Sequence, residues 1–264
     1  MIGGRRLGFI AALDFEAWDA QAVADGLCEI GYDGVEWTMA HASALVEPTI
    51  ALACQQDLVT GGEGAVVRTL EALELAAERG IGVVNLVSGP NLWEPGTVRR
   101  SDEAAWSTAL HALERICARA AALGVRAALE PCWGTLADDA ATAERVLAAV
   151  PVDVVMDPSH FVMPGDDIPA LVRAWGDRIA HVHLKDAFGT RGLEGEQFHF
   201  CLLGEGGVPW AGFFAALDEI GYAGAMSVEF EAYRYYEQVL GSDPLAAARL
   251  SLDQVRAIAS RVAA

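Results

Sequence analysis

Four residues with metal-binding side chains stand at the ends of four apolar segments in the second half of the chain. They are Glu130 in RAALEP, Asp157 in VDVVMDPSH, His183 in IAHVHLKD and Glu229 in AMSVEFE. If these segments are neighbouring strands of one parallel barrel, their carboxyl ends meet at a single mouth. Charged groups buried there are costly unless a metal ion or a partner compensates them. Three carboxylates and one imidazole at one point therefore predict a divalent-metal site, with two glutamates available for proton transfer.

Polar residues next to these strand ends add groups that can contact a substrate. His160 comes three residues after Asp157, past a proline, and we expect it to reach a substrate hydroxyl or to support a metal ligand. In HVHLKD, the two-residue period of a strand puts His181 and His183 on the same face. We assign the metal to His183 because it lies nearer the mouth, and we assign His181 to an inward layer. Lys185 follows at the rim.

The surrounding sequence alternates short apolar segments with longer segments of helical period, which is typical of βα units repeated around a parallel sheet. Eight strands are expected, over residues 7 to 13, 34 to 39, 49 to 54, 82 to 88, 126 to 131, 153 to 158, 179 to 185 and 225 to 230. We therefore predict an α/β fold in which residues 1 to 264 form one (β/α)8 TIM barrel domain. The segment between the second and third strands is too short for a full helix and contains Pro48, so the second crossover is expected to be abbreviated.

Capping residues mark the expected helix boundaries. We expect Asp14 to begin and Gly31 to end the first helix, and Ser101 to begin and Gly124 to end the helix before the fifth strand. A long Gly-rich and acidic segment, residues 188 to 207, follows the seventh strand on the face where barrels build active sites. We expect this segment to cover the site as a lid.

Composition limits the partners of the chain. Its 37 acidic residues against 18 basic ones give a net charge of −19, which disfavours nucleic acid and anionic membrane surfaces. The sequence holds no uninterrupted apolar run of about 18 residues, so no membrane span is expected. Its five cysteines are widely spaced and form no CxxC pair, which favours a reduced, cytoplasmic setting over a disulfide framework.

Six motifs in order along the chain carry a family resemblance: GYDGVEW, LEP, DPSH, HVHLKD, LGEGGVPW and SVEFE. They resemble those of the xylose isomerase-like (β/α)8 superfamily of sugar and sugar-phosphate isomerases and epimerases, which has inosose dehydratases among its relatives. The resemblance implies a divalent metal, with manganese preferred and magnesium, cobalt or zinc as alternatives. The ligands that it implies are Glu130, Asp157, His183 and Glu229. It also implies that His160 contacts the substrate, that Glu36 points into the site, and that the chain forms a homodimer or homotetramer.

The reaction expected from this resemblance is proton transfer at a carbon next to a carbonyl group. A cation that chelates adjacent oxygens would stabilise the enediolate, and the catalytic residues Glu130 and Glu229 would exchange the proton from opposite walls, giving an epimerase or an isomerase. The substrate would be a small polyhydroxylated carbonyl compound. Two alternatives stay open. One is a dehydratase of an inosose-like keto-polyol, with acid help from His160 or Lys185, and the other is a catalytically silent sugar-binding barrel.

Several positions depart from particular branches of the superfamily. Ketose 3-epimerases resemble one another in a glutamate and an arginine where this chain has Leu136 and Gly189, with Arg191 two residues late. The sparse Lys and Arg near strands seven and eight favour an unphosphorylated substrate. Histidines are absent from the ends of strands three and four, which argues against the DNA-repair endonuclease branch.

Two tryptophans, Trp93 and Trp133, follow strands four and five, where an aromatic ring can stack on a sugar or pack the rim. The residues predicted to bind substrate are His160, Glu36, Lys185, Arg191, Trp93 and Trp133.

Overall fold

Short apolar segments form the strands of the protein, and the computed structural model describes residues 3–190 and 197–262. Within these residues, eight parallel strands close into a barrel in the order β1-β10-β7-β6-β5-β4-β3-β2. The strands are β1 Leu7–Ile10, β2 Gly34–Thr38, β3 Thr49–Ala53, β4 Val83–Leu86, β5 Arg126–Leu129, β6 Asp153–Met156, β7 Ile179–Leu184 and β10 Met226–Val228. Parallel strands covered on both faces read as near-continuous apolar runs, and every residue of β7 is buried. The predicted TIM barrel is confirmed.

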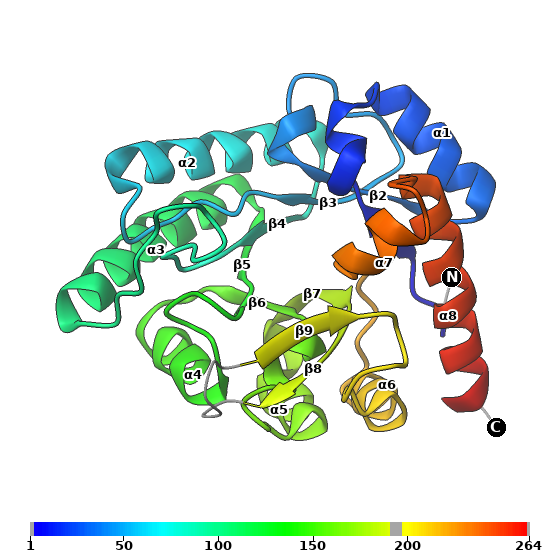
Figure 1. Cartoon of the computed structure of the whole chain (residues 1–264). Coiled ribbons are helices and arrows are strands. Elements are labelled where there is room, and N and C mark those ends of the chain that lie inside the picture. The colour runs from blue at the N-terminus through cyan, green and yellow to red at the C-terminus, as the bar shows by residue number, and fades with distance from the viewer. Residues whose placement is uncertain (1–2, 191–196, 263–264) are drawn as a thin grey trace. The chain divides into compact units, whose positions relative to one another are not determined.

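Helices connect the strands in the expected alternation (Figure 1). The α-helices are α1 Ala20–Ile30, α2 Gly62–Arg79, α3 Glu103–Leu123, α4 Ala140–Ala149, α5 Ile168–Trp175, α6 Trp210–Glu219, α7 Tyr233–Gln238 and α8 Pro244–Val262. Short 3-10 turns are η1 Leu13–Ala17, η2 Met39–His41, η3 Pro158–Phe161 and η4 Gly176–Arg178. The described residues between β2 and β3 contain the single turn η2 in place of a crossover helix, so the abbreviated second crossover is confirmed.

The predicted helix ends were right at the C-termini and wrong at the N-termini. Gly31 and Gly124 adopt the left-handed conformation that ends α1 and α3. The N-cap of α1 is Asp19, whose side chain accepts from two backbone N–H groups, and Asp14 lies in η1 instead. The N-cap of α3 is Asp102, not Ser101, because the capping side chain must stand directly before the first helical residue.

The segment expected to act as a lid contains two strands that the sequence did not indicate. β8 Asp186–Thr190 and β9 Gln197–Cys201 pair antiparallel, with Phe188 opposite His199. This hairpin follows β7 directly and leads into the turn before α6. The predicted substrate residue Arg191 lies outside the described residues.

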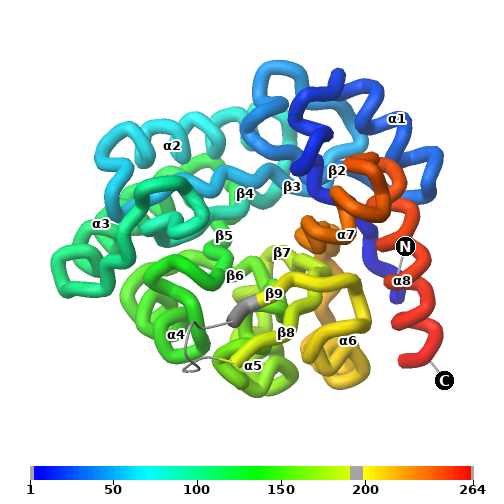
Figure 2. The backbone as a smooth tube through the Cα atoms, viewed as in Figure 1, coloured from blue at the N-terminus to red at the C-terminus, as the bar shows by residue number. Residues whose placement is uncertain are grey.

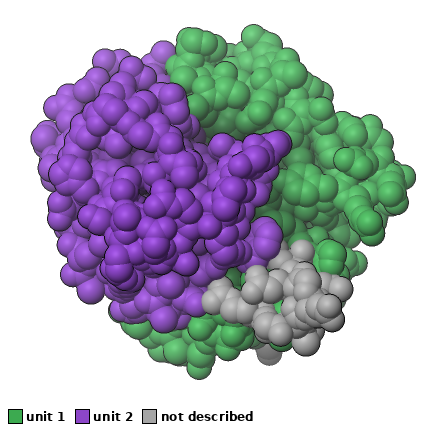
Figure 3. All heavy atoms as spheres, turned by 60° about the vertical axis from the view of Figure 1, so that its left-hand side comes forward, with its two compact units in different colours: residues 1–50, 157–177, 182–264 green, residues 51–156, 178–181 purple. Residues whose placement is uncertain are grey.

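The chain divides into two compact units (Figure 3). Unit 1 comprises Met1–Ile50, Asp157–Asp177 and Val182–Ala264, and unit 2 comprises Ala51–Met156 and Arg178–His181. Within unit 1, α1 and α8 lie side by side although they stand at opposite ends of the chain (Figures 1 and 2), and the Tyr32 hydroxyl donates to the Ala248 carbonyl at 2.8 Å. Within unit 2, α2 packs along α3. The single domain expected over residues 1 to 264 stays a prediction.

Among the described residues, no helix combines the length and the apolar character that crossing a membrane requires.

Candidate metal centre

The carboxyl ends of four strands carry the four predicted metal ligands. In unit 1, Asp157 follows β6, His183 lies in β7 and Glu229 follows β10; the first two side chains are fully buried and that of Glu229 is 13% exposed. Glu130 follows β5 and is also buried. One ligand atom from each of these four residues lies within 4.8 Å of the others. The four residues singled out by their types and positions are thus a group of the right size and chemistry for one divalent ion.

Lys185 lies beside this group and was not expected to contact the ligands. Its Nζ donates to Glu229 Oε2 at 2.5 Å and lies 3.0 Å from Asp157 Oδ2. It also donates to Glu231 Oε2 at 2.9 Å. The side chain is 3% exposed, and Lys185 is the only lysine of the chain. A buried ammonium therefore balances three carboxylates.

Glu231 is a functional candidate that the sequence interpretation missed. It stands two residues past Glu229, with the buried Phe230 between them. One oxygen accepts from Lys185, and the other accepts from the Tyr233 hydroxyl at 2.6 Å. Burial raises the pKa of Glu231, the Lys185 ammonium opposes that rise, and the Glu229 carboxylate adds to it. The one sequence signal was the alternation of acids in EFE, which gives no hint of the lysine contact.

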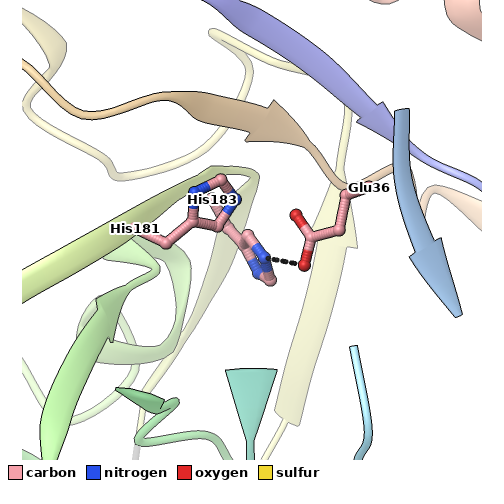
Figure 4. Close-up of side chains that lie close together, drawn as sticks. All are labelled: Glu36, His181 and His183. Atoms are coloured by element: carbon pink, nitrogen blue, oxygen red, sulfur yellow. Dashed lines mark hydrogen bonds and ion pairs between the residues drawn. The ribbon is translucent and has the colours of Figure 1, made fainter. Parts of the chain in front are cut away.

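Glu36 orients His183 from the side of the imidazole that faces β2. Its Oε1 lies 3.2 Å from Nε2 of His183, and both side chains are fully buried (Figure 4). On the other side of the ring, Nδ1 lies 3.5 Å from Glu229 Oε2. A carboxylate on the second ring nitrogen fixes the tautomer and the ring plane of a metal-binding histidine. The predicted substrate contact of Glu36 stays a prediction; the contact in the structure is with His183.

His181 forms a second group with these two residues. Glu36, His181 and His183 each offer one ligand atom within 4.8 Å of the others (Figure 4). His183 thus belongs to both groups, and His181, one inward residue earlier on β7, is buried as predicted.

The turn after β6 places Asp157 and His160 together. Asp157 Oδ1 caps η3 by accepting from the Ser159 backbone N–H at 2.8 Å, and Pro158 fixes the first position of that turn. This leaves Asp157 Oδ2 facing His160 Nε2 at 3.5 Å. The His160 ring packs edge-on against Phe200 of β9 at 5.5 Å between centroids. The DPSH motif therefore places one carboxylate oxygen and one imidazole next to each other.

In unit 2, two amide side chains hold Glu130. Gln55 Nε2 and Asn85 Nδ2 donate to its Oε2 at 3.1 and 3.0 Å. Neither amide was predicted to contact Glu130 from the sequence, and nothing in their residue types indicates this contact. The two tryptophans predicted to bind substrate differ: Trp93 is 47% exposed and Trp133 is half-buried. Their loops are joined by a hydrogen bond from Leu92 N–H to the Gly134 carbonyl at 3.3 Å.

Asp186 explains the LGEGGVPW motif. Its buried carboxylate accepts from the backbone N–H groups of Ala187, Gly204, Gly206 and Val208 and from the Trp210 indole, at 2.9 to 3.1 Å. A Cβ atom at Gly206 would collide with this carboxylate, so only glycine fits there. One side chain next to Lys185 thus fixes both ends of the segment that carries the β8–β9 hairpin.

The residues of the group fit a divalent cation. Asp157 Oδ2 is buried and accepts no well-formed hydrogen bond within the described part of the chain, although Lys185 and His160 face it. Three carboxylates and one imidazole form a donor set that manganese, magnesium, cobalt and zinc all accept.

A closed parallel barrel with this group at its strand ends defines the chain as a TIM-barrel protein with a candidate metal centre. Residues 60–258 match the family model of the xylose isomerase-like TIM barrel, and the chain belongs to that family, as the resemblance implied.

Named relatives are epimerases and dehydratases. The chain is 26% identical over 225 residues to an Escherichia coli protein with the provisional name L-ribulose-5-phosphate 3-epimerase SgbU, covering 78% of this chain and 77% of that one. It is 27% identical over 140 residues to an inosose dehydratase of Lacticaseibacillus casei, covering 48% and 47%. Among solved structures, the IolI protein with a bound zinc atom matches at a TM-score of 0.76 and 19% identity, covering 97% and 98%. That structure supports the fold.

Proposed function

We propose that the chain is a divalent-metal-dependent sugar epimerase or isomerase that moves a proton at the carbon next to a carbonyl group. The observation that carries this proposal is the group of Glu130, Asp157, His183 and Glu229, whose ligand atoms lie within 4.8 Å of one another beside a buried lysine. Manganese is the ion that we expect, with magnesium, cobalt or zinc as alternatives. A bound cation would supply positive charge to the adjacent oxygens of a hydroxy-carbonyl substrate.

Side chains of the protein itself remove the proton from the substrate and return it. A glutamate, Glu130 or Glu229, removes the proton from the carbon next to the carbonyl group; the electron pair of the broken C–H bond forms the carbon–carbon double bond, and the carbonyl electrons move to oxygen. Return of a proton to the same carbon from the opposite face gives the epimer, and return to the neighbouring carbon gives the isomer. Lys185, which donates to Glu229 at 2.5 Å, holds that carboxylate in place and adds positive charge close to the developing oxyanion.

A dehydratase is the second candidate, because Lys185 and His160 are buried acids beside the same group. In that reaction the same enediolate expels a neighbouring hydroxyl, which leaves as water after taking a proton from one of these two residues. The similarity to inosose dehydratases supports this candidate and indicates a cyclic keto-polyol as its substrate. A sugar-binding barrel without turnover is the third outcome that the experiments must separate.

The first experiment is elemental analysis of the purified protein, before and after addition of manganese. We expect about one divalent ion per chain, lost in Asp157→Asn and kept in the control Asp253→Asn, whose side chain is exposed on α8. Because Lys185 is the only lysine, lysine-selective isotope labelling gives one side-chain NMR signal at the site. Paramagnetic manganese should broaden that signal strongly. A chain that binds no ion, or an unbroadened signal, would contradict the metal centre.

The second experiment follows deuterium from solvent into ketoses, aldoses and inososes. Deuterium incorporation without loss of water supports the epimerase or isomerase, and loss of water from an inosose supports the dehydratase. Glu130→Gln should abolish either reaction. Binding of a metal and a sugar with no deuterium incorporation, and with equal sugar affinity in Glu130→Gln, would establish the silent barrel instead.

A further inference from the structure

A cavity of about 580 Å³ lies between the β8–β9 hairpin and the residues that follow β10, entirely within unit 1. Five of the eleven residues that line it carry aromatic rings, counting His199. The side chains that matter here are Phe188, His199, Phe200, Tyr233, Arg234 and Tyr235. None of them belongs to the group of predicted metal ligands.

The cavity borders the candidate metal centre through two shared contacts. The Phe200 ring lies 4.3 Å from the Lys185 ammonium, and Glu231, which also lines the cavity, accepts from that same ammonium. A second, smaller cavity of about 270 Å³ is lined by Glu229, Glu231 and Tyr233. Glu231 and Tyr233 therefore line both cavities, and the larger cavity adjoins the one that the predicted ligand Glu229 lines.

The wall chemistry fits a neutral, ring-shaped polyol. Phe188 and Tyr233 are 51% and 50% exposed, although most large apolar side chains of the chain are buried. The Phe188 and His199 rings contact each other, with centroids 5.3 Å apart and planes tilted by 34°, so that two aromatic rings stand side by side in the wall. Aromatic faces pack against the apolar face of a sugar ring, while Glu231, Glu205 and Arg234 offer partners for hydroxyl groups. Two carboxylates against one arginine disfavour an anionic occupant such as a phosphate.

We propose that this cavity binds a second sugar ring, glycosidically joined to the ring that reacts at the candidate metal centre. The substrate class is then a keto-sugar glycoside and not a free monosaccharide. The volume of the cavity lies within the range of about 300 to 1,000 Å³ that is usual for small-molecule sites. This inference rests on the proposed function for the ring that reacts, but the second-ring site is testable by binding alone.

The binding test uses the manganese-free protein and unreactive sugars: cellobiose, maltose and trehalose, with glucose as the single-ring reference. Saturation-transfer NMR should show transfer to both rings of at least one disaccharide, which should bind about tenfold more tightly than glucose. Phe188→Ala should remove most of that tenfold advantage. The control Trp18→Ala, an exposed aromatic side chain outside the cavity, should keep it. Equal affinity for glucose and all three disaccharides, or an advantage that survives in Phe188→Ala, would overturn the proposal.

The turnover test separates this inference from the proposed function. The 3-keto derivatives of the same disaccharides and of glucose are compared by deuterium incorporation, and the ratio of kcat/KM between two-ring and one-ring substrates should fall about tenfold in Phe188→Ala. Deuterium incorporation at equal kcat/KM for one-ring and two-ring substrates would support the proposed function and contradict the second-ring site. Disaccharide binding that depends on Phe188, without deuterium incorporation into any keto-sugar, would support the second-ring site and contradict the proposed function.

Discussion

The ammonium of Lys185 has three carboxylates around it, and this arrangement governs how the candidate metal centre responds to charge. Asp157, Glu229 and Glu231 lie 2.5 to 3.0 Å from its nitrogen. The ammonium thus lies at the oxygens that a divalent ion would bind. A divalent ion would compete with it for Asp157 and Glu229 and leave Glu231 as its remaining partner.

Replacing this lysine should therefore destabilise the metal-free protein most. We expect Lys185→Met to lower the free energy of unfolding by about 3 kcal/mol without metal, because three buried or partly buried carboxylates lose their cation. Manganese should then raise the Tm of the variant more than that of the parent. Thermal unfolding with a chelator and with manganese measures both shifts. Equal manganese-induced shifts in the two proteins would show that lysine and metal do not share these oxygens.

Glu36 should act on metal affinity through His183. Replacing its carboxylate in Glu36→Gln weakens the partner of Nε2, and we expect a loss of about tenfold or more in manganese affinity while the other ligands remain. Competition with a coloured chelator measures the affinity. Glu29→Gln, an exposed change on α1, is the matched control. An affinity in Glu36→Gln equal to that of the control would leave Glu36 without a role in holding the metal.

Residue types at strand ends were sufficient to single out the four residues that the structure brings together, but not the contacts among their neighbours. The strand end is a property that apolar patterning reveals, so Glu130, Asp157 and Glu229 stood out. Lys185 follows β7 and Glu231 follows β10, and the two residues are 46 positions apart in the sequence. Their contact depends on the register of β7 beside β10. That register is a tertiary property, which no local pattern encodes.

At the scale of single elements, the N-cap of α3 gives a direct comparison between sequence and structure. Asp102 accepts from the Ala105 N–H, and its pKa is lowered by the hydrogen bond from Arg100 and by that backbone N–H. A lowered pKa means that the ionised form stabilises the folded state. Its contribution is complete above the ordinary pKa of 3.8 and is lost as the pH falls below that value.

Asp102→Ala should thus lower the Tm at pH 7, and the difference from the parent should shrink as the pH falls below about 4. Ser101→Ala is the control, since Ser101 stands one position too early to cap the helix. Calorimetry at several pH values gives both curves. An equal loss of Tm in Ser101→Ala would support Ser101 as the N-cap, as the sequence predicted.

The barrel strands could be predicted because burial on both faces makes them apolar runs, whereas the β8–β9 hairpin could not. Its residues pair antiparallel on the rim, and glycine, threonine and charged residues interrupt any alternation. Backbone pairing that runs from Asp186 opposite Cys201 to Thr190 opposite Gln197 holds these two strands together. Such a pairing depends on where the chain is anchored, and a composition typical of loops hides it.

At the scale of the whole molecule, repetition made the fold predictable. Eight apolar segments separated by helical segments admit few topologies other than a parallel barrel, and even the irregular second crossover followed from its length and Pro48. The cavity beside the hairpin had no counterpart in the sequence, since its walls come from two separate segments, one between Phe188 and Glu205 and the other from Glu231 to Tyr235.

The five cysteines should remain reduced and differ in reactivity across the molecule. Burial raises the pKa of Cys54 and Cys117 to about 11, so both stay protonated at pH 8, where the thiolate is the reactive form. We expect iodoacetamide at pH 8 to modify the exposed Cys28 first and to reach Cys54 and Cys117 only after denaturation. Peptide mass spectrometry measures each site. Disulfide-linked peptides, or equal labelling rates in the native protein, would contradict this.

The carboxylate of Asp186 gathers both ends of one excursion of the chain onto a single side chain, directly after the lysine of the candidate centre. The two ends of the excursion are thus held next to each other by hydrogen bonds to one carboxylate. Phe200 lies on that excursion with its ring 4.3 Å from the Lys185 ammonium, so its position depends on the same carboxylate. Loss of this one carboxylate would therefore release both ends of the excursion together, and with them the aromatic ring that faces the candidate centre.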